Sequence, residues 1–542
     1  MRGLMMDYQL TIPALLRRAE TLFGSREIVT RLPDRRLHRT TWGEVAARVR
    51  RLAAALRQLG VEPGDRVATL CWNHAPHLET YFAAPLAGAV LHTLNLRLPP
   101  EDLAYIINHA GDRALLVDAA LLPLFERIKD LIGVRAVIVV GTHGHLTDLL
   151  LDYEALLAGA GPHAAAFPEP DERDAAAMCY TTGTTGRPKG VLYSHRALVL
   201  HSLAIALPDG MDLRERDTLL PVVPMFHANA WGLPYAAAMV GAKLVLPGPH
   251  LDPESLAELY QAERVTVTAG VPTIWMGLLQ LLDQQPGRFD LSSLRALIVG
   301  GAAAPQAMIE AFDERHGLHV VHAWGMTEMT PAGTIAHLAP GVEHASPAER
   351  YRARARQGRP FPFIDIRARG AGGLVPWDGE TMGELEVRGP WVAAAYFDAP
   401  DADDRFTEDG WFRTGDIVAI DASGSIEIKD RAKDLIKSGG EWICSVTLEN
   451  ALMGHAAVAE AAVVPIPDAR WGERPLAAVV LKPGQTATPE ELTAFLAASF
   501  PKWWLPAAFE FLDRIPRTSA GKFKKSELRE RFKDYRPPDQ GA

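Results

Sequence analysis

Apolar residues along this chain follow two patterns that alternate in the central region. Short apolar runs predict strands, and longer stretches with apolar positions every three or four residues predict helices. The predicted strands are residues 175–179, 191–193, 243–246, 265–269 and 295–299. The predicted helices are one that Ser194 caps and that runs to Ala206, residues 253–263, residues 273–282, and one that begins near Pro305. Such alternation predicts βαβ units around a parallel sheet.

The two ends of the chain extend this picture. The first 120 residues predict helices at 41–59 and 78–89 and a strand at 114–118. Residues 426–429 are expected to complete a sheet, and after Asp430 the chain has its own pattern of strands (461–465, 476–481) and a helix (489–498). We therefore predict an α/β fold, with a large multi-subdomain region of parallel-rich sheets (1–429) and a small α+β domain (430–542).

Composition and charge exclude several classes of protein. A chain of 542 residues is long enough for more than one core. Its 56 basic and 66 acidic residues give a net charge of −10, which argues against a nucleic-acid partner. Cys71, Cys179 and Cys444 form no C-x-x-C pair, so we expect neither a disulfide framework nor a zinc site. With no apolar stretch long enough to span a membrane and no clear signal-peptide core, we expect a cytoplasmic protein.

The most informative motif is residues 180–190 (YTTGTTGRPKG), between two predicted strands. Glycines let the backbone fold closely around an anion with its N–H groups pointing inward, and the threonine hydroxyls add further donors. Lys189 adds a positive charge. The spacing differs from that of a Walker A loop. The loop therefore predicts a polyphosphate site built on Thr181, Thr182, Gly183, Thr184, Thr185, Gly186 and Lys189.

Four further motifs follow in order. Residues 322–328 (HAWGMTE) combine a ring suited to stacking on a purine with Glu328, a hard oxygen ligand suited to magnesium. Residues 411–416 (WFRTGD) end on Asp416, which is suited to accept hydrogen bonds from a ribose diol. Residues 429–442 (KDRAKDLIKSGGEW) are dense in charge, and residues 516–522 (PRTSAGK) lie near the C-terminus.

Together, these motifs resemble the adenylate-forming superfamily of acyl-CoA synthetases, luciferases and peptide-synthetase adenylation domains. The resemblance spans about residues 40–525 and is strongest to bacterial fatty-acyl-CoA synthetases, through residues 223–231 (VPMFHANAW). It implies a fatty acid–CoA ligase that uses ATP, Mg²⁺ and coenzyme A and forms AMP and pyrophosphate. It also implies that the small C-terminal domain is mobile.

The resemblance assigns roles residue by residue. Catalytic roles fall to Lys522, His227 and Lys437. Besides the loop, the implied nucleotide contacts are Ala302, His322, Ala323, Trp324, Thr327, Asp416, Arg431, Lys433, Lys437 and Trp442. The implied magnesium ligands are Thr181 and Glu328. The implied contacts of the acyl and pantetheine groups are His227, Ala228, Trp231, Gly300, Gly301, Ser438, Gly439 and Gly440. Trp324 stands where most members carry tyrosine; it keeps a ring that can stack on adenine and lacks the phenol hydroxyl.

The chemistry explains why such residues are needed. A carboxylate does not react with a thiol at neutral pH until its oxygen becomes part of a good leaving group, here AMP. Attack on the α-phosphate concentrates negative charge, which cations and oriented donors stabilise. The resemblance implies that Lys522 bridges the carboxylate and the α-phosphate. It further implies that the small domain then rotates about Asp430 and brings residues 438–441 to the acyl-adenylate.

The identity of the acid rests on fewer residues. His227 stands where adenylation domains for α-amino acids usually carry aspartate, so an amino-acid substrate is not expected. Trp231 and the small residues 299–304 predict an apolar lining for an acyl tail, and the resemblance implies that Trp231 gates it. The small residues equally suit tight strand–helix packing. Chain length is not determined by these residues.

Other motifs favour structural roles. His74 and His77 lack a recognisable set of accompanying ligands, and Ser194 before His195 suits a helix cap better than a hydrolase nucleophile. We expect Trp503 and Trp504 to pack within the small domain, and arginines 352, 354 and 356 to form a solvated face.

Alternatives remain for the activity. The acyl group could pass to the phosphopantetheine of a carrier protein instead of CoA, or the chain could be a binding relative without catalysis. Retention of Lys522, Glu328 and Asp416 argues against the second. A homodimer is expected, with residues 2–36 as the suspected contact.

Overall fold

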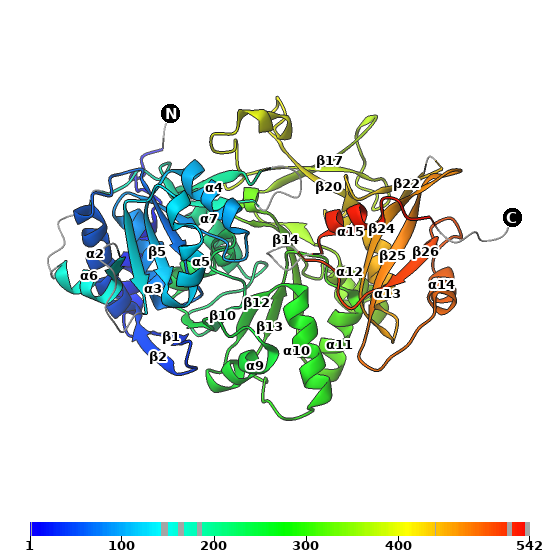
Figure 1. Ribbon diagram of the computed structural model, residues 1–542, viewed down its shortest axis with the longest axis horizontal. Coiled ribbons are helices and arrows are strands. Elements are labelled where there is room, and N and C mark those ends of the chain that lie inside the picture. Colours follow the sequence, from blue (N-terminus) through cyan, green and yellow to red (C-terminus); the bar gives the residue numbers. More distant parts are fainter. Residues whose placement is uncertain are drawn as a thin grey trace.

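The computed structural model describes residues 1, 3–141, 150–160, 167, 169–181, 187–439, 441–517 and 523–536, without the side chains of residues 401 and 403. The fold has two large sheets, an antiparallel sheet and a small C-terminal unit (Figure 1). In the described part of the chain, none of the helices has the length and apolar character of a membrane-spanning segment.

The first sheet has seven strands and is parallel except at one edge. Its order is β7 (Leu150–Asp152), β6 (Ala136–Val140), β5 (Asp112–Asp118), β3 (Arg66–Leu70), β4 (Val90–Thr93), β8 (Ala175–Tyr180), β9 (Gly190–Ser194). Only β8 and β9 pair antiparallel, and they flank the glycine-rich loop. The loop therefore leaves the sheet at the end of its β8 strand.

The second sheet has nine strands. Its order is β16 (Arg359–Pro360), β15 (Ala332–Ile335), β14 (Val320–Gly325), β13 (Ala296–Val299), β12 (Val267–Gly270), β10 (Thr218–Pro221), β11 (Lys243–Leu246), β1 (Glu27–Arg31), β2 (Leu37–Thr41). The strands from β14 to β1 run parallel, and the edge strands pair antiparallel. The βαβ alternation predicted from the sequence is thus confirmed.

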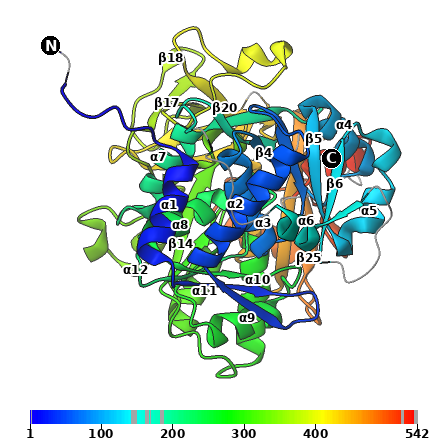
Figure 2. The ribbon, with the colours of Figure 1, turned by 90° about the vertical axis from the view of Figure 1, so that its left-hand side faces the viewer.

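Helices form layers on both sides of these sheets. The helices between them share one core: α1 (Ile12–Phe23), α2 (Trp42–Gln58), α3 (Ala75–Leu86), α7 (His195–Ala206) and α8 (Leu233–Val240). The outer face of the nine-stranded sheet carries α9 (Pro253–Ala262), α10 (Pro272–Gln284), α11 (Gln306–His316) and α12 (Pro347–Ala355). Helices α4 (Pro100–Ala110), α5 (Leu122–Glu126) and α6 (Tyr153–Gly159) complete the region around the first sheet, with α2 and α3 in front of it in Figure 2.

Short 3₁₀ segments occupy the connections. They are η1 (Ala119–Leu121), η2 (Lys129–Leu131), η3 (Ala228–Gly232), η4 (Thr327–Met329), η5 (Val342–His344) and η6 (Pro400–Arg405). Three of them, η3, η4 and η6, line the cavity described below. They present side chains from connections between strands of the nine-stranded sheet and of the antiparallel sheet.

An antiparallel sheet links the large region to the C-terminal unit. Its order is β18 (Gly373–Leu374), β17 (Asp365–Gly370), β19 (Gly383–Arg388), β20 (Phe412–Ile420), β21 (Ile426–Arg431). The strand predicted to end at residue 429 continues to Arg431, because Asp430 and Arg431 still pair with Ile417 and Asp416 of β20. Asp430 therefore belongs to a sheet of the large region.

The C-terminal unit has its own sheet and cores. Its sheet order is β23 (Glu441–Ile443), β22 (Ile436–Ser438), β25 (Gly472–Leu481), β24 (Val458–Asp468), and β26 (Ala508–Phe511) pairs with β25. Helices α13 (Ser445–Met453) and α14 (Pro489–Ala497) cover one face, and α15 (Lys525–Phe532) covers the other. The boundary near Asp430 remains a prediction, which this separate packing supports.

Local sequence signals set several of the element ends. Ser194 Oγ accepts the N–H of Ala197 at 3.1 Å and caps α7, as predicted. Thr41 and Glu44 form a reciprocal capping box at the start of α2. Strand β11 matches its predicted bounds at both ends.

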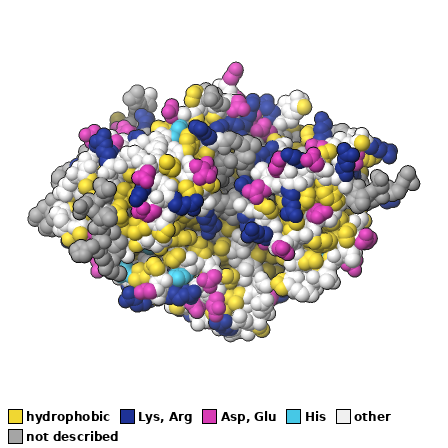
Figure 3. Space-filling model, viewed as in Figure 1, with side chains coloured by type: hydrophobic (Ala, Val, Ile, Leu, Met, Phe, Trp, Pro, Cys, Tyr) yellow, Lys and Arg dark blue, Asp and Glu magenta, His cyan; other side chains and the backbone are white. Residues whose placement is uncertain are grey.

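One surface prediction is wrong for two of its three arginines, whereas Arg352 is exposed as predicted. Arg354 is 7% exposed and pairs with Asp313 at 2.8 Å, and Arg356 pairs with Asp421 at 2.5 Å. These two arginines therefore bridge elements rather than face solvent, because the chain folds acidic partners over them. Trp504 packs in the small unit as predicted, where it stacks on Phe500 with ring centroids 5.7 Å apart, whereas Trp503 is 39% exposed. Over the face of the whole molecule seen in Figure 3, basic and acidic side chains are interspersed.

Candidate active site

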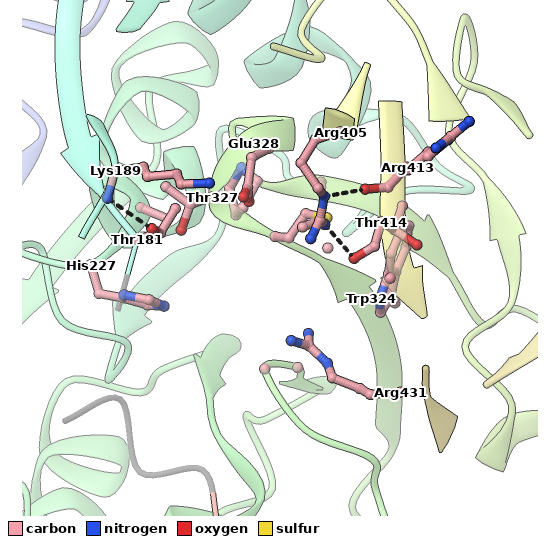
Figure 4. Close-up of a pocket in the computed structure, with 18 of the residues that line it drawn as sticks. Thr181, Lys189, His227, Trp324, Thr327, Glu328, Arg405, Arg413, Thr414 and Arg431 are labelled. Carbon is pink, nitrogen blue, oxygen red and sulfur yellow. Dashed lines mark hydrogen bonds between the residues drawn. The ribbon is translucent and has the colours of Figure 1, made fainter. Parts of the chain in front are cut away.

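A cavity of about 600 Å³ lies where the nine-stranded sheet, the antiparallel sheet and the end of β8 meet (Figure 4). It gathers many of the predicted site residues: Thr181, Lys189, His227, Ala228, Trp231, Gly300, Gly301, Ala323, Trp324, Thr327, Glu328, Arg431 and Lys433. A second cavity of about 230 Å³ shares Trp324 with the first and adds Ala302, His322 and Asp416. Residues far apart in the sequence thus line two adjoining cavities.

The two ends of the glycine-rich loop are held together. Thr181 N–H donates to the Lys189 carbonyl at 2.9 Å, and Lys189 N–H donates to Thr181 Oγ1 at 3.2 Å. The ammonium of Lys189 lies 5.0 Å from the ring centroid of Tyr396, a cation–π distance. The predicted contacts Thr182, Gly183, Thr184, Thr185 and Gly186 lie outside the described residues, so the phosphate-binding role of the loop stays a prediction.

Glu328 is buried beside this loop base. Its Oε1 accepts the hydroxyl of Tyr396 at 2.6 Å, and burial together with the Glu328 carboxylate raises the pKa of Tyr396. A carboxylate can accept further hydrogen bonds or bind a cation with its other lone pairs. Thr181 and Glu328 line the same cavity with oxygen ligands of the type that Mg²⁺ prefers, so the residues present fit that ion.

Asp416 lies in strand β20, and each of its carboxylate oxygens has one partner within the protein. Trp324 Nε1–H donates to Oδ2 at 2.9 Å, and Arg431 Nε lies 3.0 Å from Oδ1. The Asp416 carboxylate is the main cause that raises the pKa of the Arg431 guanidinium. The carboxylate side chain is only 3% exposed, so it sits at the wall of the cavity as a fixed acceptor.

The apolar side of the cavity depends on an unusual backbone. Residues 228–231 in η3 have positive φ angles of 43° to 56°. L-residues pay about 1–2 kcal/mol each in this left-handed conformation, so the surrounding structure must hold the turn in place. The turn directs Trp231 towards Gly300, where an added Cβ would lie 3.1 Å from Trp231 Cη2. His227 lies at the start of this turn and faces the cavity.

The predicted hinge residue is part of a buried polar network. Asp430 Oδ2 accepts the backbone N–H and the hydroxyl of Ser445 at 2.5 and 2.6 Å. It thereby supplies the cap of α13 that Cys444 does not provide. Lys525 Nζ donates to Ser445 Oγ at 2.7 Å and lies 2.6 Å from Glu449 Oε1. Burial raises the pKa of the Asp430 carboxyl, and Lys525 opposes this shift.

The remaining C-terminal predictions divide into two groups. Lys522 and Gly440 lie outside the described residues, although Phe523 and Lys524, just after Lys522, line the cavity with Asp416. Lys437, Ser438, Gly439 and Trp442 lie on the β22–β23 hairpin and line neither cavity. Lys437 N–H instead donates to Glu473 at 2.8 Å. Their roles stay predictions that require a different orientation of the small domain.

Several cavity residues were missed from the sequence. Tyr396 and Arg405 line the cavity, and Arg405 donates to the carbonyls of Arg413 and Thr414 at 2.9 Å each (Figure 4). Thr414 lies within a motif that the analysis had quoted. Tyr396 lies in a loop and Arg405 ends η6, and neither carries a local pattern that marks a site, so only the fold brings them to Glu328 and β20.

A second group of potential metal ligands has a structural explanation. Cys71, His74 and Asp118 have ligand atoms within 4.8 Å of one another, a grouping that the sequence spacing had not indicated. His74 Nδ1 accepts the N–H of His77 and caps α3, while Nε2 lies 2.5 Å from Asp118. Both ring nitrogens of His74 are thus used within the protein, and we assign His74 to helix capping.

Comparison with known proteins agrees with this geometry. The family described as AMP-binding enzyme matches residues 17–397, and its C-terminal domain matches residues 447–522. The chain is 53% identical to a long-chain-fatty-acid–CoA ligase of Thermus thermophilus, covering 98% of this chain and 97% of the relative. It is 44% identical to a medium-chain-fatty-acid–CoA ligase of Ectopseudomonas oleovorans, covering 98% of both.

Solved structures extend the likeness to the fold. The anthranilate CoA ligase AuaEII in complex with anthranoyl-AMP has a TM-score of 0.86 and 25% identity, covering 97% of this chain and 98% of that chain. ATP-bound MatB from Rhodopseudomonas palustris has a TM-score of 0.82 and 26% identity, covering 97% and 99%. The chain therefore belongs to the AMP-binding enzyme family of adenylate-forming proteins.

Proposed function

We propose that this protein is an ATP- and Mg²⁺-dependent ligase that activates a fatty acid as its acyl-adenylate and transfers the acyl group to CoA. The observation that carries the proposal is the cavity in which a phosphate-loop base, a buried Glu328 and an apolar wall at Gly300 meet. Such a cavity brings a nucleotide phosphate and a carboxylate together. The named relatives, which are fatty acid–CoA ligases, support the substrate class.

The residues divide the work of the first half-reaction. We propose that the loop from Thr181 to Lys189 binds the β- and γ-phosphates, and that Asp416 accepts hydrogen bonds from the ribose. Lys522 is proposed to neutralise the charge that develops between the carboxylate and the α-phosphate. Mg²⁺, when bound at Thr181 and Glu328, supplies positive charge to the phosphate oxygens.

The second half-reaction requires room for a thiol. The β22–β23 hairpin with Lys437, Ser438 and Gly439 lines neither cavity in this structure. We propose that rotation about Asp430 brings this hairpin to the acyl-adenylate once pyrophosphate has left. Separate packing of the small unit supports such a movement, because its cores are formed by its own residues.

The test is pyrophosphate release with ATP and magnesium across straight-chain acids of roughly four to eighteen carbons, with and without CoA. A CoA-dependent rate that peaks at one chain length supports the ligase and reports the size of the pocket. Release that CoA does not change indicates a carrier-protein acceptor instead. Absence of release with every acid contradicts the proposal.

We also propose a homodimer in the cytoplasm. Leu4, Met5 and Met6 in the segment before α1 are exposed, and Figure 2 shows this segment leading away from the rest of the chain. Three free cysteines suit a reducing compartment. Deletion of residues 1–9 followed by light scattering tests the dimer, since a mass unchanged by the deletion counts against this contact.

A further inference from the structure

Trp324 donates a buried, directed hydrogen bond to the carboxylate of Asp416. The indole Nε1–H points at Asp416 Oδ2 at 2.9 Å, and both side chains are almost fully buried. In Figure 4 the Trp324 ring lies beside Thr414 at the wall of the cavity. Trp324 comes from β14 of the nine-stranded sheet and Asp416 from β20 of the antiparallel sheet. A hydrogen bond to a buried carboxylate is among the stronger kinds in proteins.

The indole itself is fixed by a glycine. A Cβ added to Gly333 of β15 would lie 2.5 Å from Trp324 Cζ3 and 2.9 Å from Met329 Cε. Any side chain larger than that of glycine at position 333 would clash with the six-membered ring of the indole. The direction of the N–H group is therefore set by packing, not by the hydrogen bond alone.

The two donors to Asp416 are Trp324, which precedes the proposed hinge in the sequence, and Arg431, which follows it. Arg431 lies in β21 beside Asp416 but follows Asp430, the proposed hinge, so a rotation about Asp430 changes the contact of Arg431 with Oδ1. Trp324 and Asp416 both precede the hinge, in β14 and β20. The Trp324 contact is therefore the one that persists when the small domain moves.

A carboxylate offers about four lone-pair sites on its two oxygens. Trp324 and Arg431 take one on each oxygen, which leaves acceptor capacity on both oxygens for the two hydroxyls of a ribose. A nucleotide that lacks one hydroxyl leaves a buried acceptor without a partner, which costs affinity.

We infer that Trp324 is a positioning residue for the ribose: its indole N–H aims Asp416 at the ribose hydroxyls, and the site thereby selects ribonucleotides over deoxyribonucleotides. The inference rests on the proposed function, because it assigns a further residue to the same nucleotide site. It concerns the hydrogen bond of the indole and not its stacking face.

The test compares kcat/KM for ATP, 2′-deoxy-ATP and 3′-deoxy-ATP in acid-dependent pyrophosphate release. We expect the wild-type protein to prefer ATP by about 10- to 100-fold over at least one deoxy analogue, the factor that loss of a hydrogen bond to a charged group produces. Trp324→Phe keeps an aromatic face and removes the N–H. We expect this preference to fall by about tenfold.

Trp391→Phe is the matched control. Trp391 is 2% exposed, and its Nε1–H also donates at 2.9 Å, but to the backbone carbonyl of Ala332. This variant loses an equivalent hydrogen bond away from Asp416 and is expected to keep the wild-type preference within about twofold. A second variant, Gly333→Ala, displaces the indole without changing it and should lower the preference as Trp324→Phe does.

A double-mutant cycle completes the test. Asp416→Asn is expected to lower the preference by itself, and adding Trp324→Phe to it should change the preference no further. If Trp324→Phe weakens ATP and both analogues by the same factor, the residue acts through stacking alone and the inference is wrong. A wild-type protein without any ribose preference overturns it equally.

Failure of the proposed function gives a different result. Wild-type protein that releases no pyrophosphate with ATP and any acid contradicts the ligase. Calorimetric binding of ATP and 2′- and 3′-deoxy-ATP to the same variants then measures the ribose preference directly. The inference fails there if the wild-type protein binds ATP and both analogues equally, or if Trp324→Phe leaves the ratio unchanged.

Discussion

Replacement of Asp430 separates the two half-reactions, if this residue is the hinge. Asp430→Pro fixes φ near −65° and should prevent rotation of the small domain, whereas adenylation in the present orientation should continue. The substitution also removes the carboxylate that caps α13 through Ser445. A matched Asp430→Ala variant removes the same carboxylate and leaves the backbone free.

Both variants lose the Asp430 carboxylate, and the contacts of that carboxylate determine how much stability each variant loses. Loss of an N-cap costs about 1 kcal/mol, and loss of a hydrogen bond to a charged group costs about 1.5–3 kcal/mol. Both variants should therefore lose about 2–4 kcal/mol of local stability around α13. This loss should be equal in the two variants, so it cancels when they are compared.

The backbone effect is then what differs between them. If φ of residue 430 must move away from −65° during the rotation, proline raises the free-energy barrier of that step by about 3 kcal/mol or more. This increase corresponds to about a hundredfold in rate. We expect Asp430→Pro to form thioester from prepared acyl-adenylate and CoA at least about a hundredfold more slowly than Asp430→Ala. Adenylation, measured by ATP–pyrophosphate exchange, should agree within about threefold between the two variants.

Two results would refute this reasoning. Equal thioester rates in the proline and alanine variants would show that the backbone at residue 430 does not need to rotate. Loss of adenylation in Asp430→Pro but not in Asp430→Ala would show that the φ angle imposed by proline is not compatible with the observed orientation of the small domain. Thermal unfolding of both variants measures any further loss of stability in Asp430→Pro, which also lacks the backbone N–H at this position of β21.

Three further predictions follow from the site and the core. Gly300→Ala places a methyl 3.1 Å from Trp231 Cη2, so overpacking by about 1–3 kcal/mol should lower kcat/KM for long acids about tenfold more than for butyrate, measured across the acid series. Glu328→Gln keeps an acceptor for Tyr396 and removes the charge; we expect kcat to fall about 10²- to 10³-fold and the magnesium requirement to rise, while Tyr396→Phe, its control, keeps the carboxylate and should lose far less. Burial lowers the pKa of His201 to about 3, below its unfolded value near 6.5, so the stability that the neutral imidazole contributes is present above pH 6.5 and is lost as pH falls towards 3. In urea titrations, His201→Gln should therefore reduce the loss of unfolding free energy between pH 7 and pH 5 by about 2 kcal/mol. An unchanged pH dependence in this variant would contradict the prediction.

The sequence predicted the elements best where local chemistry decides them. Ser194 before an apolar helix, and the run at 243–246, gave correct bounds because a cap or a short apolar run stabilises its element wherever it packs. The end of β21 was placed two residues short because the domain boundary was expected at Asp430. Their pairing with β20 depends on partners that the local sequence does not contain.

The chemical types of the site were also present in the sequence. Hydroxyls and glycines at 180–190, a ring with a carboxylate at 324 and 328, and Asp416 indicated a nucleotide site from residue type alone. Arg354 shows the limit of such reasoning: its charge indicated solvent, but the fold buries it against Asp313. Exposure is a property of what packs over a residue, so composition does not determine it.

The sequence by itself thus determined the order of strands and helices, the glycine-rich loop and the residue types of a phosphate and ribose site. Only the tertiary structure decided that Tyr396 meets Glu328, that Asp430 caps a helix of the small unit, and that Trp324 donates to Asp416. The physical reason is that capping and periodicity act over a few neighbouring residues, whereas these contacts join residues 15, 68 and 92 positions apart. Such contacts exist only after the sheets have brought distant segments together.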